Sequence, residues 1–248
     1  MNRCALCAIL LSAFAAAPAA AHVSYTGRDF GSFDAASTQT VTISGQSVTG
    51  NYGWIDGADS DWGDAHRTRA FRFSITQAAD VTLSFEQAAV SGKLMGLVPG
   101  FSVYQGLAHL PPDALDYDYS AVTTAYRAGL GFPTEGGFNA LGDFKLGNDT
   151  GDLSTFTWKG SALDGSGWMG DGLPDNKVAA TFHLAAGDYS VFVGGGDYLA
   201  QLPSNPNLIA GYGLSGTITV AAVPEPGTWA MLFAGLAVMG LVARRHAG

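Results

Sequence analysis

The sequence predicts an all-β protein: an antiparallel β-sandwich of jelly-roll type, flanked by an N-terminal signal peptide and a single C-terminal hydrophobic helix. Three observations predict this fold class. Apolar and polar residues alternate with a period of two along many short segments, as they do in half-buried strands. Glycine, aspartate, asparagine and proline separate these segments, and the 248-residue chain contains 34 glycines. Between the two ends of the chain, only residues 114–130 offer a helical pattern.

Eight or nine strands follow from this alternation. The clearest have an apolar residue at every second position, at 71–75, 81–85, 178–184 and 189–193. Shorter strands are expected at 41–43, 101–103, 156–158 and 214–220. Residues 51–67 and 130–155 interrupt the series, and we expect long loops there, which in compact domains are either functional or mobile.

Residues 1–21 have the features of a secretory signal peptide. Arg3 gives a positive start, an apolar stretch follows, and residues 19–21 offer a small-residue cleavage site. Cys4 and Cys7, the two cysteines of the chain, both lie inside this segment. We therefore expect export by the general secretion pathway of a domain, residues 22–222, that has no disulfide and depends on its core.

Residues 223–248 combine a proline-containing strip, an apolar run and a basic pair. The run 227–243 carries no charge and would span about 25 Å as a helix, which is short for a permanent membrane span. Arg244 and Arg245 resist export, so the positive-inside rule places them in the cytoplasm and the domain outside. We expect a transient insertion of this transmembrane helix into the inner membrane. The alternative is a hydrophobic helix of the globular domain that follows a proline linker.

The strip before this helix is suited to a protease. Pro224 and Pro226 fix the backbone and disfavour helix, so an extended segment is exposed just outside the membrane, with Trp229 at the boundary. This combination resembles the PEP-CTERM sorting signal. The residues that carry the resemblance are Val223, Pro224, Glu225, Pro226, Trp229, Arg244 and Arg245.

The resemblance implies a processing partner and a destination. Proteins with this signal are recognised by a membrane-embedded exosortase and cleaved near Pro-Glu-Pro. They occur in Gram-negative bacteria that make exopolysaccharide or biofilm matrix, and they are destined for the cell surface or the extracellular matrix. Within the domain, the segments 71–86, 99–105 and 184–195 are also similar to secreted bacterial pre-peptidase C-terminal domains, which are accessory β-sandwiches.

The charge of the domain excludes some partners. Between residues 22 and 222 there are nine Lys and Arg against twenty Asp and Glu, which gives a net charge of −11. Such a balance argues against nucleic acid and against anionic membrane surfaces. It suits solubility and divalent cations.

Two acidic loops are candidates for calcium, because loops of Asp and Gly can supply several oxygens to one ion. The first contains Asp56, Asp59, Asp61 and Asp64, and its spacing is not that of an EF-hand. The second, with Asp171 and Asp175, is similar to the second half of the calcium loops in thrombospondin-type and dockerin repeats. Its first-half ligands are missing, since Met169 and Gly167 stand there. The alternatives are a solvated polar loop and a Gly/Pro turn.

Loop tryptophans beside these carboxylates are candidates for carbohydrate binding. Trp54, Trp62 and Trp168 could stack on sugar rings. The alternative is that they close the ends of the sandwich core, which we expect of Trp158 because it lies in a strand.

Catalysis finds little support in the sequence. The domain has no Gly-x-Ser-x-Gly elbow and no thiol. Its histidines are scattered, and His183 is expected at the surface. We therefore expect a non-enzymatic structural or interaction protein linked to exopolysaccharide and biofilm. A calcium- or carbohydrate-binding module is the alternative, and a polysaccharide-acting hydrolase is a distant one.

Overall fold

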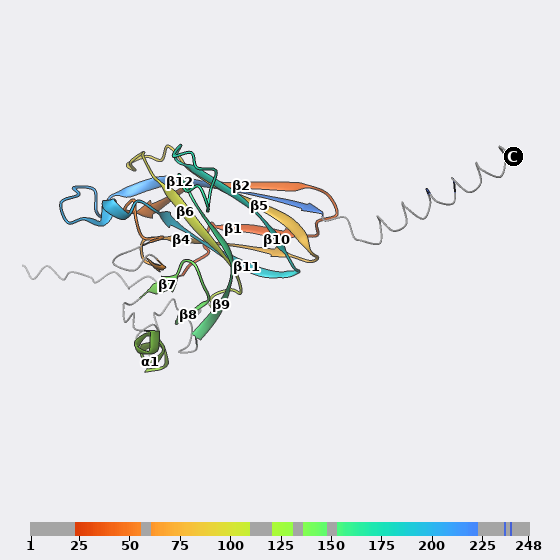
Figure 1. Cartoon of the computed structure of the whole chain (residues 1–248), viewed down its shortest axis with the longest axis horizontal. Helices are drawn as coiled ribbons and strands as arrows, with labels where there is room; N and C mark the ends of the chain where they lie inside the picture. The colour runs from red at the N-terminus through yellow and green to blue at the C-terminus, as the bar shows by residue number, and fades with distance from the viewer. Residues whose placement is uncertain are drawn as a thin grey trace, which may run out of the picture.

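The computed structural model describes residues 23–55, 61–109, 121–130, 136–147 and 153–222, together with Leu236 and Met239 (Figure 1). Strands dominate this part of the chain, as the alternation predicts. In chain order the elements are β1 (Asp29–Phe33), β2 (Gln39–Thr49), β3 (Trp62–Asp64), β4 (Arg69–Ile75), β5 (Ala79–Gln87), β6 (Pro99–Gln105), α1 (Ala121–Leu130), β7 (Gly137–Asn139), β8 (Phe144–Gly147), β9 (Leu153–Leu163), β10 (Lys177–Leu184), β11 (Gly187–Gly195), the short 3₁₀ helix η1 (Tyr198–Gln201) and β12 (Gly211–Ala222).

Two sheets form the sandwich, and their order is that of a jelly roll. One sheet has the order β10-β5-β12-β2, and the other has the order β1-β4-β11-β6-β9-β8. When β2, β4, β5, β6, β9, β10, β11 and β12 are numbered one to eight, strands one, eight, three and six share the first sheet. Strands two, seven, four and five share the second. This interleaving confirms the predicted jelly-roll sandwich. Only β1 departs from antiparallel pairing within the two sheets, since it lies parallel to β4.

The main core lies between the two sheets. It is built from the alternating residues that predict the strands, such as Phe71 and Phe73 on β4, and Val81, Leu83 and Phe85 on β5. Aromatic pairs hold the centre of this core, with the rings of Phe71 and Phe85 5.2 Å apart.

A second core covers the outer face of the six-stranded sheet. It contains Trp54, Tyr104, Phe138, Phe144 and Phe192 among others. Because both faces of this sheet are covered, β11 is buried from the third residue to the last, and Phe192 on its outer face is as buried as Val191 and Val193 on its inner face.

The expectation of two plain loops at 51–67 and 130–155 is wrong. Each region contributes strands, and β3 pairs with β7 so that Gly63 lies opposite Phe138. β8 pairs with β9 at the sheet edge. Strands of three or four residues are too short to produce a periodic pattern, which is why the alternation does not predict them.

The ends of the chain are only partly described. The predicted helix 114–130 is observed as α1, and residues 114–120 lie outside the described residues. The predicted signal peptide 1–21 lies outside them too. So does the tail 223–248, except for Leu236 and Met239, which are helical and exposed. Within the described part of the chain, no helix has the length and apolar character needed to cross a bilayer.

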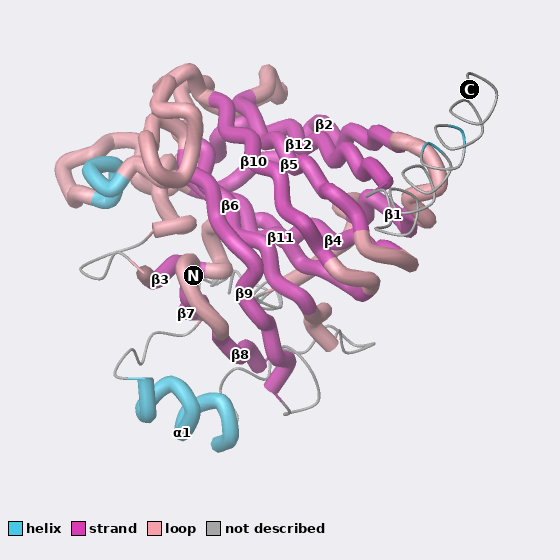
Figure 2. Tube along the Cα trace, turned by 45° about the vertical axis from the view of Figure 1, so that its right-hand side comes forward, coloured by secondary structure: helices cyan, strands magenta, loops and turns pink. Residues whose placement is uncertain are grey.

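The sandwich has two unlike ends, which Figure 2 shows. The connections 88–98, 164–176 and 196–210 meet at one end, where Gly211 pairs with Thr49 and Gly195 pairs with Pro99. We call it the loop end. At the opposite end β12 stops at Ala222, beside Ala79 on β5. We call this the tail end.

Candidate functional sites

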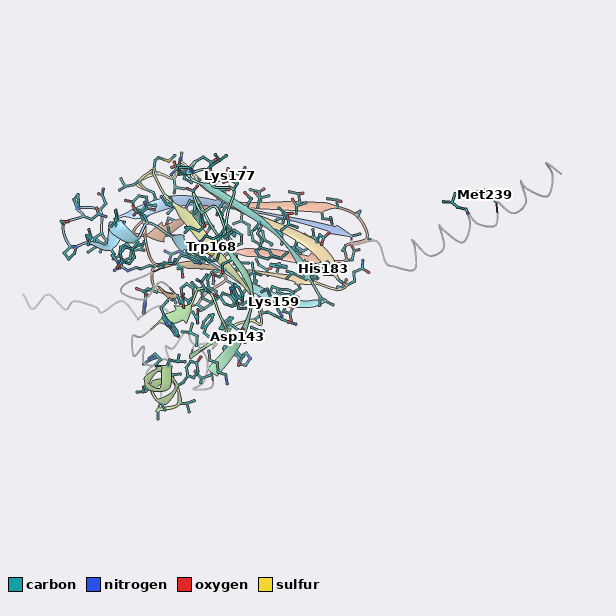
Figure 3. All side chains as sticks on the ribbon, viewed as in Figure 1. Asp143, Lys159, Trp168, Lys177, His183 and Met239 are labelled. Carbon is teal, nitrogen blue, oxygen red and sulfur yellow. The ribbon has the colours of Figure 1, made fainter. Side chains whose placement is uncertain are left out.

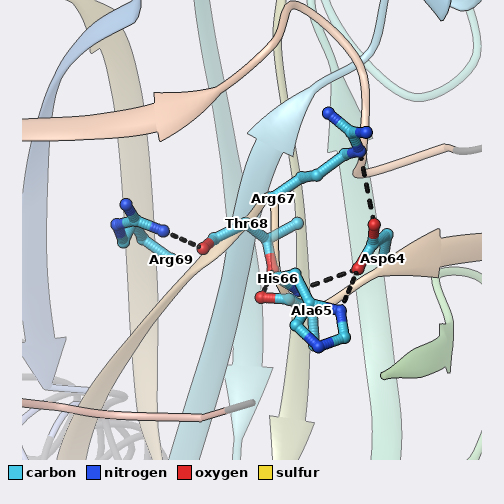
Figure 4. Close-up of polar contacts among 6 residues, drawn as sticks. All are labelled: Asp64, Ala65, His66, Arg67, Thr68 and Arg69. Atoms are coloured by element: carbon cyan, nitrogen blue, oxygen red, sulfur yellow. Dashed lines mark hydrogen bonds and ion pairs between the residues drawn. The ribbon is translucent and has the colours of Figure 1, made fainter. Parts of the chain in front are cut away.

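Asp64 ends β3 and organises the tight turn that leads into β4 (Figure 4). Its Oδ1 accepts hydrogen bonds from the backbone N–H of His66, at 2.9 Å, and from the His66 ring nitrogen Nδ1, at 2.8 Å. Its Oδ2 lies 3.3 Å from Nε of Arg67. The guanidinium of Arg67 in turn lies over the ring of Tyr52, 4.2 Å from its centroid.

These partners determine the pKa of the Asp64 carboxyl. Burial by itself raises the pKa of this carboxyl, but the hydrogen bonds from His66 and the charges of His66 and Arg67 outweigh it. The pKa of Asp64 is therefore lower than that of an ordinary aspartate. The Asp64 carboxylate therefore stabilises the turn between β3 and β4.

In the second acidic loop, Asp164 has the corresponding role. This buried side chain accepts hydrogen bonds from the backbone N–H groups of Asp175, at 3.1 Å, and Asn176, at 3.0 Å. Burial raises its pKa, and the nearby charges of Asp175 and Asp171 raise it further, against the effect of the two N–H bonds. Asp171 and Asp175 accept backbone N–H bonds from Leu173 and Lys177, each two residues further on. These bonds are typical of Asx turns.

The described carboxylates do not support the calcium prediction. Asp61, Asp64, Asp171 and Asp175 are in the described part of the chain, and no group of three or more acidic, histidine or cysteine side chains there is arranged to hold a metal ion. Asp56 and Asp59 lie outside the described residues.

Trp54 is a structural residue. It is 0% exposed, and its Nε1 donates to Oγ of Ser102 at 2.7 Å. Glycines surround its indole: a Cβ at Gly100 would lie 2.4 Å from Cε3 of Trp54. No ring face is free, so Trp54 does not offer a platform to a sugar.

Trp158 was expected to be buried in the core but is exposed, which is the reverse of the result for Trp54. It lies in β9 but is 38% exposed. The pairing of β9 with β6 shifts here, since Tyr104 lies opposite Trp158 while Val103 lies opposite Gly160. The extra residue, Lys159, makes a bulge. A glycine inside a strand is a sequence signal for such a bulge, so Gly160 could have indicated this one.

A chain of hydroxyl groups joins the two tryptophans. Trp158 Nε1 donates to Oγ of Ser161 at 2.9 Å. Ser161 and Ser102 both donate to the carbonyl oxygen of Ala140, at 2.7 and 2.6 Å. Sequence reasoning missed these residues, because serines at the outward positions of a strand look like ordinary surface residues.

The remaining predicted residues are accessible to different degrees. Trp62 is partly buried in β3, where it pairs with Asn139. Trp168 stands out from its loop and is 77% exposed, so it keeps its predicted availability. His183 lies on the surface of β10 as expected, with Nδ1 3.1 Å from Oδ1 of Asp80 (Figure 3).

The match to a known motif lies just beyond the last strand. Residues 222–245 match the model of the PEP-CTERM protein-sorting motif. The chain carries a PEP-CTERM motif. This confirms the resemblance drawn from Pro224, Glu225 and Pro226, and it indicates an exported protein that an exosortase sorts. The similarity of the central strands to pre-peptidase domains stays a prediction.

Solved structures similar to this chain include two copper-binding proteins. One is the surface-associated copper-binding protein CorA of Methylomicrobium album BG8, with 17% identity, a TM-score of 0.44, and coverage of 78% of this chain and 98% of that one. Another is the secreted protein MopE of Methylococcus capsulatus, with 15% identity, a TM-score of 0.45, and coverage of 79% and 87%.

A third similar structure is PliG of Aeromonas hydrophila, a periplasmic inhibitor of g-type lysozyme. Its identity is 10% and its TM-score 0.26, over 77% of this chain and 98% of that one. All three TM-scores lie below 0.5, so no function is carried over from these proteins. No curated protein matches the chain.

The PEP-CTERM motif begins where the sandwich ends. β12 stops at Ala222, and the matched residues start at the same position. The sorting residues Val223, Pro224, Glu225, Pro226, Trp229, Arg244 and Arg245 lie outside the described residues.

Proposed function

We propose that this chain is a non-enzymatic protein of the cell surface or extracellular matrix of an exopolysaccharide-producing Gram-negative bacterium. An exosortase cleaves it near Pro-Glu-Pro after transient insertion of the tail into the inner membrane, and the sandwich then takes a structural or interaction role in the matrix. The observation that carries this proposal is the PEP-CTERM motif at residues 222–245, directly after the last strand of a self-contained domain.

The architecture supports cleavage without damage to the domain. Among the described residues, both cores lie between Val23 and Val220. We therefore expect residues 23–222 to fold as a unit after residues 223–248 are removed.

The test is to replace the motif in the producing bacterium. The double substitution Glu225→Ala with Pro226→Ala is expected to leave an unprocessed precursor in the inner-membrane fraction, whereas the wild-type protein reaches the cell surface or the medium in a shorter form. Glu86→Ala is the matched control, because Glu86 is an exposed residue of the domain and its loss leaves the motif intact. Normal release of the double variant would overturn the proposal.

A further inference from the structure

The loop end of the sandwich exposes an unusual amount of apolar surface. Eight large apolar side chains are exposed on its three connections, with Trp168 at 77%, Ile209 at 78% and Leu199 at 67%. The eight are Leu94, Met95, Trp168, Leu173, Tyr198, Leu199, Leu202 and Ile209. Gathered apolar side chains of this kind mark interaction surfaces, whereas single ones need no explanation.

The three fully described connections of the tail end expose no large apolar side chain. These connections, 34–38, 76–78 and 185–186, contain only small or polar residues. The exposed apolar side chains are thus concentrated at one end of the same sandwich.

The three connections of the loop end are tied together by hydrogen bonds of the Asn51 and Asn176 side chains and of the backbone. Asn51 donates to the carbonyl of Gly96 at 3.0 Å and accepts from the N–H of Val98 at 2.7 Å. Asn176 donates to the carbonyl of Leu97 at 2.9 Å, which joins connection 164–176 to connection 88–98. The N–H of Gly196 donates to the carbonyl of Val98 at 2.7 Å, which adds connection 196–210. The apolar side chains therefore stand on a fixed platform.

The chemistry of the eight side chains favours lipid over sugar. Six are aliphatic, whereas sugars stack on flat aromatic rings. The other two, Trp168 and Tyr198, combine an apolar ring with a polar group, which is the chemistry of residues at a bilayer surface.

The charge of the loop end selects the kind of lipid. Its three connections hold one basic residue, Lys93, and four acidic ones, Asp164, Asp171, Asp175 and Asp197. An anionic bilayer attracts basic segments, so this end does not suit one. It suits a bilayer with zwitterionic headgroups.

The loop end lies opposite the end of the sandwich from which the tail leaves. β12 has 12 residues between Gly211 at the loop end and Ala222 at the tail end. At about 3.4 Å per residue, a strand of this length separates the two ends by about 40 Å. The loop end therefore faces away from the point where the PEP-CTERM motif begins.

We propose that the loop end docks onto a bilayer of zwitterionic phospholipid through Trp168, Tyr198 and the aliphatic side chains around them. This contact gives the protein a peripheral lipid attachment that does not depend on the tail. It remains after the tail has been removed.

The test is flotation of the domain, residues 23–222, with vesicles of phosphatidylcholine and phosphatidylethanolamine. The wild-type domain is expected to float with the vesicles. The double variant Leu199→Ser with Ile209→Ser is expected to bind at least about tenfold more weakly, since each buried aliphatic side chain contributes about that factor. Val122→Ser is the matched control, because Val122 is an exposed aliphatic residue of α1, outside the loop end, and its loss should leave binding unchanged.

Four results would overturn the proposal. These are no flotation of the wild-type domain, equal binding by the double variant and the wild type, binding that requires phosphatidylglycerol, and protection of the loop end by self-association in the absence of lipid. A change of tryptophan fluorescence with the host's polysaccharide that Trp168→Phe abolishes, without vesicle binding, would assign this end to a glycan instead. Circular dichroism of the double variant separates loss of binding from loss of folding.

Discussion

The tail end and the loop end of the sandwich are built on the same strands but have opposite character. At the tail end, connections such as 76–78 and 185–186 are short, and the chain leaves β12 directly into the PEP-CTERM motif. At the loop end, three long connections are joined by hydrogen bonds of amide side chains and of the backbone, and they expose apolar residues. Long connections in a compact domain are usually either functional or mobile, and the hydrogen bonds between these three favour the first.

This difference separates delivery from binding. The tail end leads into the motif that indicates where the protein goes, and both cores, as far as the chain is described, end at Val220. The loop end is supported by the second core, since Trp54 contacts Gly195 there through a backbone hydrogen bond of 3.0 Å. Changes at one end should therefore leave the other end intact.

The largest effect is expected for Trp54→Ala, which removes the support of the loop end. Because Trp54 is fully buried, the substitution should lower the free energy of unfolding by about 3–5 kcal/mol. Denaturant titration of residues 23–222 measures this. Trp168→Ala, the matched exposed control, should change it by less than about 0.5 kcal/mol. Equal costs at the two positions would contradict the assignment of their roles.

A smaller effect is expected for Asn51→Ala. The substitution leaves the carbonyl of Gly96 and the N–H of Val98 without their partner, at a cost of about 1–3 kcal/mol. Proteolysis should then cut connection 88–98 faster. Asn207→Ala, at an exposed position of connection 196–210, is the control. Unchanged stability and cleavage in Asn51→Ala would show that the hydrogen bonds of the Asn51 side chain do not fix the position of connection 88–98.

Asp64 and Asp164 should respond to pH in opposite directions. The pKa of Asp64 is lowered, so its stabilising effect is present above the ordinary aspartate pKa of about 3.9 and is lost as pH falls through the lowered value. The pKa of Asp164 is raised, so its protonated form favours the fold below that ordinary value, and this advantage is lost as pH rises through the raised value.

Unfolding titrations at pH 3 to 7 test this pair. As pH rises, the unfolding free energy of Asp64→Asn should fall relative to that of the wild type. The unfolding free energy of Asp164→Asn should instead rise relative to that of the wild type. Parallel slopes for the two variants would be incompatible with the contacts described for these carboxylates.

The smallest effect is expected at the tail end. Removal of residues 223–248 should change the free energy of unfolding of the domain by less than about 0.5 kcal/mol, because β12 ends at Ala222 and no core residue is lost. Chemical denaturation of residues 23–222 and of residues 23–248, both in the same detergent, gives the comparison. A large loss of stability would mean that the tail is part of the folded domain.

The sequence predicts the sandwich well where strands are long and half-buried. The alternation at 71–75 and 81–85 corresponds to β4 and β5, and their partners at 178–184 and 189–193 correspond to β10 and β11. The second core could not be predicted in this way. β3 and β7 are three residues long, and the face that they cover carries Ser102 and Tyr104, which resemble the polar side of an ordinary strand.

The tryptophans show why a candidate site is harder to predict than a fold. Trp54 lies in a region without periodicity and is nonetheless fully buried, because glycines on three neighbouring strands and turns leave space for its indole. Trp158 lies in a strand and is exposed, because a bulge turns it outward. Exposure depends on contacts between distant segments, and among the four described tryptophans only Trp168 has the accessibility that its loop position indicates.

The difference between the two ends can be tested most directly by chemical labelling. The domain 23–222 contains no cysteine, so single cysteines can be placed by Ile209→Cys at the loop end and by Gln77→Cys at the tail end. Zwitterionic vesicles should slow the reaction of a water-soluble maleimide at position 209 at least about tenfold and leave position 77 unchanged. Equal labelling rates at the two positions in the presence of vesicles would contradict the account.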